Sequence, residues 1–259
     1  MSDTSPKNSP RNRLDTALVA RELAETRAKA QGLILSGRVL IDGSVVAKCG
    51  APVRPEQSVT VAPDPRPFVS RGGGKLEGAL DDFGISCDGR TGLDVGASTG
   101  GFTDCLLRRG VLKVYAADVG ENLMDDRLRR DPRVVVIERT NFRHAAADLL
   151  PEKVSIATVD VSFISLRHIL PPLRLFLLPG AAVVALVKPQ FEVGREWVGK
   201  GGIVRDEGKR QEAVSGIKSF AESLGFSVEK QAESRLAGPG RNREVFIYLR
   251  WGGSPPFSE

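Results

Sequence analysis

The chain of 259 residues is 41% hydrophobic and 27% charged, which is typical of a globular protein with one or two domains. Its longest unbroken apolar run covers residues 181–187, whereas a membrane-spanning helix needs about 20 such residues. No apolar stretch follows the polar start of the chain, so we expect no secretory signal and a cytoplasmic location. Three cysteines without CxxC spacing and two histidines predict neither a disulfide framework nor a metal site.

The positive charge of the chain is concentrated near its start. Residues 1–75 contain 12 lysines and arginines against 7 acidic residues, whereas residues 76–259 contain 25 of each kind. A basic module ahead of a neutral one indicates that the first part binds a polyanion, although a generally basic protein would give the same net charge.

The first part of the chain is expected to form a small α+β domain at residues 13–62. Residues 1–12 are polar without apolar periodicity and predict a disordered tail. Thr26 suits a helix N-cap, Gly37 a helix end and Asp42-Gly43 a hairpin turn. The proline-rich residues 63–67 predict a stiff linker. The predicted helices cover residues 13–24 and 27–36, and the strands cover residues 38–46, on both sides of the turn, and 58–62.

Residues 68–251 alternate between strand and helix patterns, which predicts a mostly parallel sheet with helices on both faces. The last two strands are joined by a short Gly/Pro segment and should be antiparallel. The expected fold class is therefore α/β, with a Rossmann-like seven-stranded sheet, followed by a tail at residues 252–259. The predicted strands cover residues 91–95, 113–118, 133–138, 154–161, 181–188, 226–231 and 244–250, and the helices cover residues 101–109, 121–130, 165–176 and 206–224.

A glycine-rich loop follows the first of these strands, which lets a backbone approach a ligand closely at a helix N-terminus. Its GxxxGG spacing disfavours a dinucleotide site, and hence a nicotinamide oxidoreductase. Asp94 suits the cationic end of a ligand, and Asp118 suits ribose hydroxyls. S-adenosylmethionine fits both, and a strand–helix corner without a ligand is the alternative. The expected cofactor residues are Asp94, Gly96, Ala97, Ser98, Thr99, Gly100, Gly101, Phe102, Asp118, Val119, Asn141 and Asp160, with Phe142 as a further adenine contact.

Four charged residues are candidates for catalysis: Lys75, Asp160, Lys188 and Glu244. Lys188 ends a run of seven apolar residues, where a charge is costly without a partner, and Asp160 at the end of the preceding strand is the expected partner. The alternative is a purely structural ion pair. A neutral lysine here can accept the proton of a ribose hydroxyl during methyl transfer, with Lys75 supplying a nearby cation.

Two other methyl-transfer chemistries are disfavoured. Methyltransferases that act on exocyclic amines usually carry an Asn/Asp-Pro-Pro-aromatic turn, whereas this chain has Asp160-Val161-Ser162-Phe163. No cysteine ends a strand at the predicted crevice, which argues against cysteine-dependent carbon methylation.

The chain resembles the TlyA (hemolysin A) family of ribosomal RNA 2'-O-methyltransferases over residues 13–250. The resemblance implies an S4-type RNA-binding domain, an FtsJ-like S-adenosylmethionine-dependent domain at residues 68–251, and cytidine 2'-O-methylation of ribosomal RNA. It also implies a Lys-Asp-Lys-Glu tetrad at Lys75, Asp160, Lys188 and Glu244. The motifs that carry it are Arg13-Leu14-Asp15 and residues 69–72, 94–103, 116–120, 138–141, 160–166 and 186–194.

This chain departs from the family pattern at two places. Gly73 and Gly74 precede Lys75 where a bulkier residue often stands, so a looser Lys75 is expected. Residues 21–27 are more acidic than is usual on this surface, so weaker or shifted RNA binding is expected.

The residues expected to contact RNA are Arg13, Arg21, Arg27, Lys29, Arg38, Lys200 and Arg241. Phosphate contacts of this kind give affinity but little sequence choice, and a solvated charged face is the alternative for any one of them. No aromatic platform for base stacking stands out. Two other functions stay open, a non-catalytic ribosome-assembly factor and a membrane-active hemolysin, of which the second lacks an amphipathic basic helix.

Overall fold

The computed structural model describes residues 12–35, 37–62, 68–236 and 242–253. The chain divides into two compact units, residues 1–65 and 66–259, each of which contains a hydrophobic core of its own. Of the expected disordered tail at residues 1–12, residues 1–11 lie outside the described residues, as do the proline-rich linker at residues 63–67 and residues 254–259 of the second tail. The prediction is wrong for Asn12, which pairs with Val53 as the first residue of a short strand.

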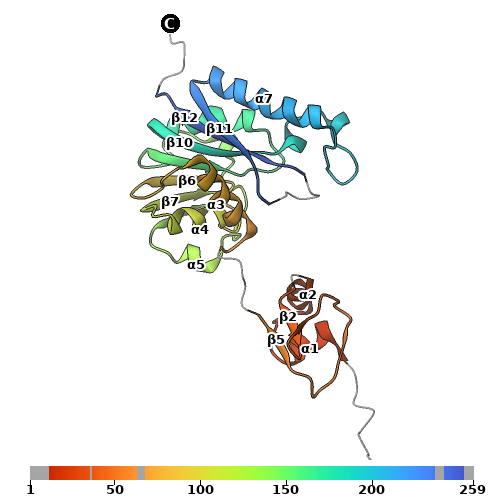
Figure 1. Ribbon diagram of the computed structural model, residues 1–259. Coiled ribbons are helices and arrows are strands. Elements are labelled where there is room, and N and C mark those ends of the chain that lie inside the picture. Colours follow the sequence, from red (N-terminus) through yellow and green to blue (C-terminus); the bar gives the residue numbers. More distant parts are fainter. Residues whose placement is uncertain (1–11, 36, 63–67, 237–241, 254–259) are drawn as a thin grey trace, which may run out of the picture. The chain divides into compact units, whose positions relative to one another are not determined.

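The small unit is the α+β module that the sequence predicts, with two helices and short strands around one core (Figure 1). Its first helix is shorter than predicted because Arg13 is extended and pairs with Pro52, and because Glu22 has a positive φ of 58° just past the helix end. The elements are β1 (Asn12–Arg13), α1 (Leu14–Ala20), α2 (Arg27–Leu35), β2 (Val39–Ile41), β3 (Ser44–Val45), β4 (Pro52–Val53) and β5 (Val59–Val61).

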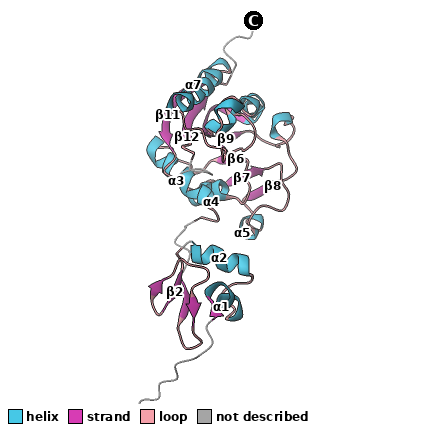
Figure 2. Ribbon diagram, turned by 90° about the vertical axis from the view of Figure 1, so that its right-hand side faces the viewer, coloured by secondary structure: helices cyan, strands magenta, loops and turns pink. Residues whose placement is uncertain are grey.

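The large unit contains a seven-stranded sheet in the order β11-β12-β10-β9-β6-β7-β8 (Figures 1 and 2). The five strands from β10 to β8 are parallel, and β12 runs antiparallel to both of its neighbours, as predicted for the last pair. The strands are β6 (Thr91–Val95), β7 (Lys113–Ala117), β8 (Val134–Ile137), β9 (Val154–Val159), β10 (Leu177–Val187), β11 (Phe226–Glu233) and β12 (Val245–Trp251).

Helices cover both faces of this sheet. On one face, α3 (Arg71–Phe83), α4 (Gly101–Arg108) and α5 (Asp126–Arg129) share a core with Val184 and Leu186 of β10. On the other face, α6 (Leu170–Leu173) and α7 (Glu207–Ser223) share a core with Val183 and Ala185. The side chains of β10 thus alternate between two cores, which is why its sequence is apolar throughout.

Three helix predictions need correction. No helix was predicted before β6, yet α3 spans the triple glycine, begins at the Ser70 cap and ends at Gly84 with a positive φ. The helix expected at residues 165–176 is broken into a 3₁₀ turn, α6 and a second 3₁₀ turn because Pro171 and Pro172 fit only a first helical turn. The helix expected at residues 121–130 is reduced to α5, which begins after its Asp125 cap.

The strand register brings the predicted site residues to one edge of the sheet. Val95 lies opposite both Ala117 and Val159, so the next residues along the three strands emerge side by side. Val187 lies opposite Val245, so Lys188 and Glu244 also meet at this edge. The carboxyl ends of parallel strands are where open α/β sheets bind ligands.

Candidate active site

The glycine loop between β6 and α4 brings three backbone segments into contact. Gly96 has a φ of +84°, and a Cβ there would lie 2.4 Å from the backbone oxygen of Asp160. A Cβ at Gly101 would lie 2.2 Å from Ser70 Oγ, at the start of α3. Side chains at these positions would force the segments apart, so both glycines are required by close packing, and Gly96 also by its backbone conformation.

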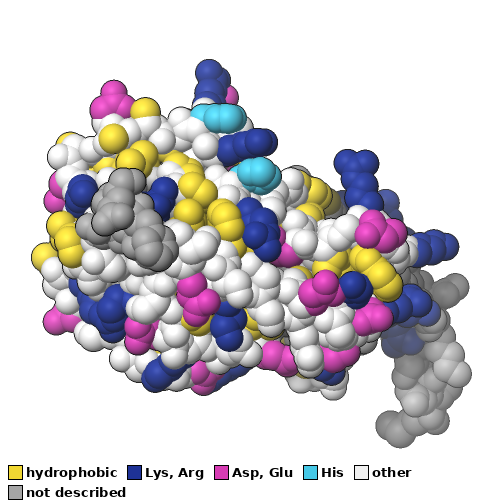
Figure 3. Space-filling view, turned by 90° about the horizontal axis from the view of Figure 1, so that it is seen from above, with side chains coloured by type: hydrophobic (Ala, Val, Ile, Leu, Met, Phe, Trp, Pro, Cys, Tyr) yellow, Lys and Arg dark blue, Asp and Glu magenta, His cyan; other side chains and the backbone are white. Residues whose placement is uncertain are grey.

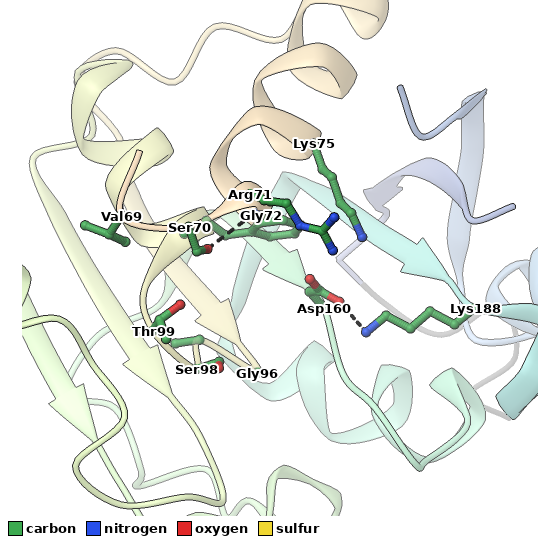
Figure 4. A pocket seen from close by; sticks show the side chains of 13 residues that line it. Val69, Ser70, Arg71, Gly72, Lys75, Gly96, Ser98, Thr99, Asp160 and Lys188 are labelled. Carbon is green, nitrogen blue, oxygen red and sulfur yellow. Dashed lines mark hydrogen bonds and ion pairs between the residues drawn. The ribbon is translucent and has the colours of Figure 1, made fainter. Parts of the chain in front are cut away.

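Two cavities open beside this loop. The first has a volume of about 410 Å³ and contains all the predicted catalytic residues except Glu244 (Figure 4). The second has a volume of about 440 Å³ and shares Gly96, Ser98 and Asp160 with the first. A ligand that reaches from one cavity to the other would therefore pass along the glycine loop and Asp160. The second cavity is otherwise lined by residues that include Asp118, Val119, Leu123, Asn141, Phe142 and Phe163.

The four predicted catalytic residues form two ion pairs. Lys75 Nζ lies 2.6 Å from Glu244 Oε2, and Lys188 Nζ lies 2.6 Å from Asp160 Oδ1. Both lysine side chains are only 9% exposed, so each needs the carboxylate beside it. Lys188 also donates a hydrogen bond of 2.8 Å to Ser162 Oγ. The predicted pairing of Lys188 with Asp160 is confirmed.

Lys75 is held more firmly than its glycine neighbours suggest. A Cβ at Gly73 would lie 2.2 Å from the ring of Phe68, so a bulkier residue does not fit there without displacing the ring. Lys75 itself lies on α3, buried, and reaches Glu244 from that helix. Lys75 is thus buried and paired despite the two glycines before it, and its expected looseness stays a prediction.

Asp94 does not reach either cavity, in contrast to the predicted role at the cationic end of a ligand. It is fully buried and accepts hydrogen bonds from Thr103 Oγ1 at 2.7 Å and Thr158 Oγ1 at 3.0 Å. Burial raises the pKa of Asp94 to about 7, against the effect of the two threonine hydrogen bonds. Asp94 ties the start of α4 to β9, which makes it a structural support of the loop.

The other predicted cofactor residues differ in their access to the cavities. Gly100 lines neither cavity and acts as the N-cap of α4 with a φ of +93°. The Asp118 carboxylate accepts hydrogen bonds from the backbone N–H of Ser98 at 2.8 Å and of Gly120 at 2.7 Å, which fixes its position at the second cavity. The remaining predicted residues line one or both cavities: Gly96, Ala97, Ser98, Thr99, Gly101, Phe102, Asp118, Val119, Asn141 and Asp160.

Sequence reasoning missed two residues at the cavities. Arg71 is exposed, points into the first cavity, and has no hydrogen-bond or ion-pair partner among the residues that the structure describes (Figure 4). Phe163 is 90% exposed, has a positive φ of 64°, and contacts the Phe191 ring at a centroid distance of 5.2 Å. It is an aromatic surface beside the site, which the sequence had not indicated, although it directly follows Asp160-Val161-Ser162.

The predicted RNA contacts of the small unit are held in different ways. Arg21 donates to the backbone oxygens of residues 54, 55 and 57, and Arg38 donates to that of Ala62. Lys29 pairs with Glu25, from the acidic segment noted above, whereas Arg13 and Arg27 both bind Asp15. In the large unit, Lys200 is exposed on a turn, and Arg241 lies outside the described residues.

Both histidines are exposed and lie among lysine and arginine side chains (Figure 3). Within the described residues, no group of three or more His, Cys, Asp and Glu side chains suits a metal ion. In the same residues, no helix is both long enough and apolar enough to cross a membrane.

Comparison with known proteins shows two family models that match this chain. The family model of FtsJ-like methyltransferases matches residues 68–251, and that of the S4 domain matches residues 12–59. The chain belongs to the FtsJ-like methyltransferase family. The predicted enzyme class, Rossmann-like fold and S4-type domain are thereby confirmed.

Relatives match this methyltransferase over nearly its whole length. It is 46% identical over 241 residues to the 16S/23S rRNA (cytidine-2'-O)-methyltransferase TlyA of Mycobacterium tuberculosis, which covers 93% of this chain and 90% of the relative. It is 40% identical over 238 residues to Hemolysin A of Brachyspira hyodysenteriae, covering 92% and 99%. A solved structure from Streptococcus thermophilus, named as a hemolysin, is 40% identical with a TM-score of 0.75 and covers 96% of this chain and 91% of that one.

Proposed function

We propose that this methyltransferase transfers a methyl group from S-adenosylmethionine to the ribose 2'-hydroxyl of a cytidine in ribosomal RNA. The observation that carries the proposal is the meeting of two lysine–carboxylate pairs beside one cavity, next to the glycine loop. The named activity of the Mycobacterium tuberculosis relative supports the nucleotide and the RNA class.

The second cavity fits the nucleoside end of S-adenosylmethionine. Its lining combines the fixed Asp118 carboxylate, which suits ribose hydroxyls, with the apolar side chains of Val119, Leu123 and Ile164, which suit a base. The shared wall of Gly96 and Ser98 leads from there to the lysine pairs. When bound, the cofactor supplies an electrophilic methyl group on a sulfonium centre.

Lys188 is placed to accept the proton of the attacking hydroxyl. A neutral amine has two N–H groups and one lone pair. Ser162 Oγ accepts a hydrogen bond from one of the N–H groups at 2.8 Å, and Asp160 Oδ1 lies 2.6 Å away as the ion-pair partner of the protonated form. These two groups hold the amine at the cavity, where it accepts the proton of the substrate once it has lost its own. Proton transfer to a positioned base typically increases the reaction rate by about 10²- to 10⁴-fold.

Arg71 adds positive charge to the same cavity. The charges of Lys75 and Lys188 are each matched by a carboxylate, whereas Arg71 has no such partner among the described residues. A preorganised cation beside the reacting oxygen stabilises the negative charge that develops as the proton leaves. The adjoining phosphate of the RNA is a second ligand for this guanidinium.

The first experiment combines the full chain, methyl-labelled S-adenosylmethionine and ribosomal subunits that lack the modification. A 2'-O-methyl group prevents alkaline cleavage of the neighbouring phosphodiester, so we expect the label in alkali-resistant dinucleotides. Label in single nucleotides only would mean base methylation and would contradict the proposed role of the lysine pairs. No label, with an active control enzyme on the same subunits, would favour a non-catalytic assembly factor.

A further inference from the structure

The buried carboxylate of Asp15 holds two arginines of the small unit on one anchor. Arg13 donates from Nε to Oδ1 and from Nη2 to Oδ2, both at 3.1 Å. Arg27 donates from Nε to the same Oδ2 at 3.0 Å. Gln31 Nε2 and the Thr16 backbone N–H complete the set at 3.0 Å each. Two cationic side chains from different segments are therefore fixed at one point.

The burial of these groups is unequal. The Asp15 side chain is 0% exposed, whereas those of Arg13 and Arg27 are 55% and 58% exposed. The Arg13 guanidinium holds the pKa of the Asp15 carboxyl well below its usual range, and the hydrogen bonds from Gln31 and Arg27 act in the same direction. The anchor is hidden and charged, while more than half of each arginine side chain is exposed.

We propose that Asp15 is a positioning residue that converts Arg13 and Arg27 into one preformed site for RNA phosphate. Arg27 uses only Nε in the anchor, so both of its Nη groups stay available. The anchor leaves Nη1 of Arg13 unused, and this atom lies close to Gly50, where a Cβ would be 2.9 Å from it. Such forks match phosphate oxygens in geometry and charge. Fixing both side chains before RNA arrives removes part of the ordering cost of binding. This inference rests on the proposed RNA substrate.

The negative charge of Asp15 lets the direction of the change in RNA affinity test the proposal. Removing a negative charge from a basic RNA-binding unit should strengthen RNA binding if only net charge mattered. If Asp15 acts by orienting the two arginines, removing its charge weakens RNA binding instead. The sign of the change separates the two explanations.

The test measures binding of the full chain to a fluorescently labelled fragment of ribosomal RNA over a series of salt concentrations. We expect Asp15→Asn to weaken binding about tenfold and to reduce the salt dependence, because ordered phosphate contacts are lost. In the methylation assay, the KM for RNA rises while kcat at saturating RNA stays unchanged. Glu56→Gln, at an exposed residue with no hydrogen bond or ion pair to the described residues, removes the same charge from the same unit and should not weaken binding.

A double-mutant cycle distinguishes positioning from a general effect on folding. In a background of Arg13→Ala with Arg27→Ala, adding Asp15→Asn should change RNA affinity less than twofold. A full tenfold loss in that background, or an Asp15→Asn single variant that binds RNA as tightly as the parent chain, would overturn the proposal. A parent chain that binds no RNA would overturn the proposed function itself.

A replacement variant covers the case in which Asp15→Asn disrupts the small unit, as judged by circular dichroism and proteolysis. Arg13→Lys with Arg27→Lys keeps both charges but lacks the guanidinium forks. We expect this pair to weaken RNA binding about tenfold as well. Binding equal to that of the parent chain would contradict a preformed arginine site.

Discussion

Lys188 ends a strand in which residues 181–187 are all buried, and its amine meets Asp160 and Ser162 just beyond the last of them. An amine charge is costly at the end of a buried strand, so the Asp160 carboxylate explains why a lysine is tolerated there. The first cavity, which Lys188 lines, gives the amine access to a substrate. The hydrogen bond to Ser162 Oγ fixes the orientation of the Lys188 amine. The chemistry proposed for Lys188 thus depends on two side chains from the turn after β9.

Replacement of Lys188 by alanine should remove the proton acceptor. We expect kcat to fall by about 10²- to 10⁴-fold, while the dissociation constant for S-adenosylmethionine, measured by calorimetry, changes only a few-fold. Lys113→Ala is the control, because Lys113 pairs with Glu152 at the opposite end of the sheet. A Lys188→Ala variant with nearly full activity would mean that another base or solvent takes the proton.

Asp94 makes the free energy of unfolding depend on pH. Its pKa is about 7 in the folded chain against 3.8 for the free side chain, so the folded state binds the extra proton between these values. Its contribution therefore favours folding at low pH and is lost as pH rises from about 4 to about 7, by at most about 4 kcal/mol. In urea unfolding, the difference in the free energy of unfolding between the parent chain and Asp94→Asn should therefore change as the pH rises from about 4 to about 7. A pH-independent gap would contradict the raised pKa of Asp94.

At the scale of elements, the strands were predictable and α3 was not. Apolar runs mark β8 and β10 directly, and the register of the sheet then fixes which residues meet at its edge. The triple glycine of α3 opposes helix formation on its own, and only tertiary packing supports it. The sequence also predicted a cofactor contact for Asp94. Tertiary structure again decides otherwise, because the carboxylate is buried and accepts hydrogen bonds from two threonines that are distant in the sequence or on another element.

Adjacent glycines in α3 allow this packing to be tested. Gly73→Ala should reduce stability by about 1–3 kcal/mol, because its Cβ would overlap the Phe68 ring at 2.2 Å. Gly74→Ala should leave stability unchanged or raise it by up to about 1 kcal/mol, because the nearest atom is 3.6 Å away in Leu236 and alanine favours the helix. Thermal and chemical unfolding of the two variants would be compared. Equal effects would mean that Phe68 yields readily.

At the scale of the whole molecule, we propose that RNA binding and chemistry are divided between the two units. Each unit has its own core, and the excess positive charge within residues 1–75 includes Arg66, Arg71 and Lys75 of the large unit. The composition predicted a basic first part of the chain, but the charge excess does not follow the boundary between the units, since residues 1–65 carry a net charge of +2 and residues 66–259 a net charge of +3. The cavities that we propose for the cofactor belong entirely to residues 66–259.

A shortened chain of residues 66–259 should therefore keep its affinity for S-adenosylmethionine and lose affinity for ribosomal RNA. We expect RNA binding at least about tenfold weaker, with a smaller salt dependence, because cationic contacts to phosphate are removed. Calorimetry with the cofactor is the control for folding of the remaining unit. Unchanged RNA affinity would place the main RNA surface on the catalytic unit.

Asp160 stands in the wall between the two cavities and holds Lys188 from that position. A ligand in the second cavity that shifts the Asp160 carboxylate would also shift the Lys188 amine in the first cavity. Thermodynamic reciprocity then requires that a cofactor which favours RNA binding by some factor is itself held more tightly by that factor once RNA is present. If the two cavities bind the cofactor and the RNA as proposed, a single carboxylate shared in this way would make the two substrates each other's effectors.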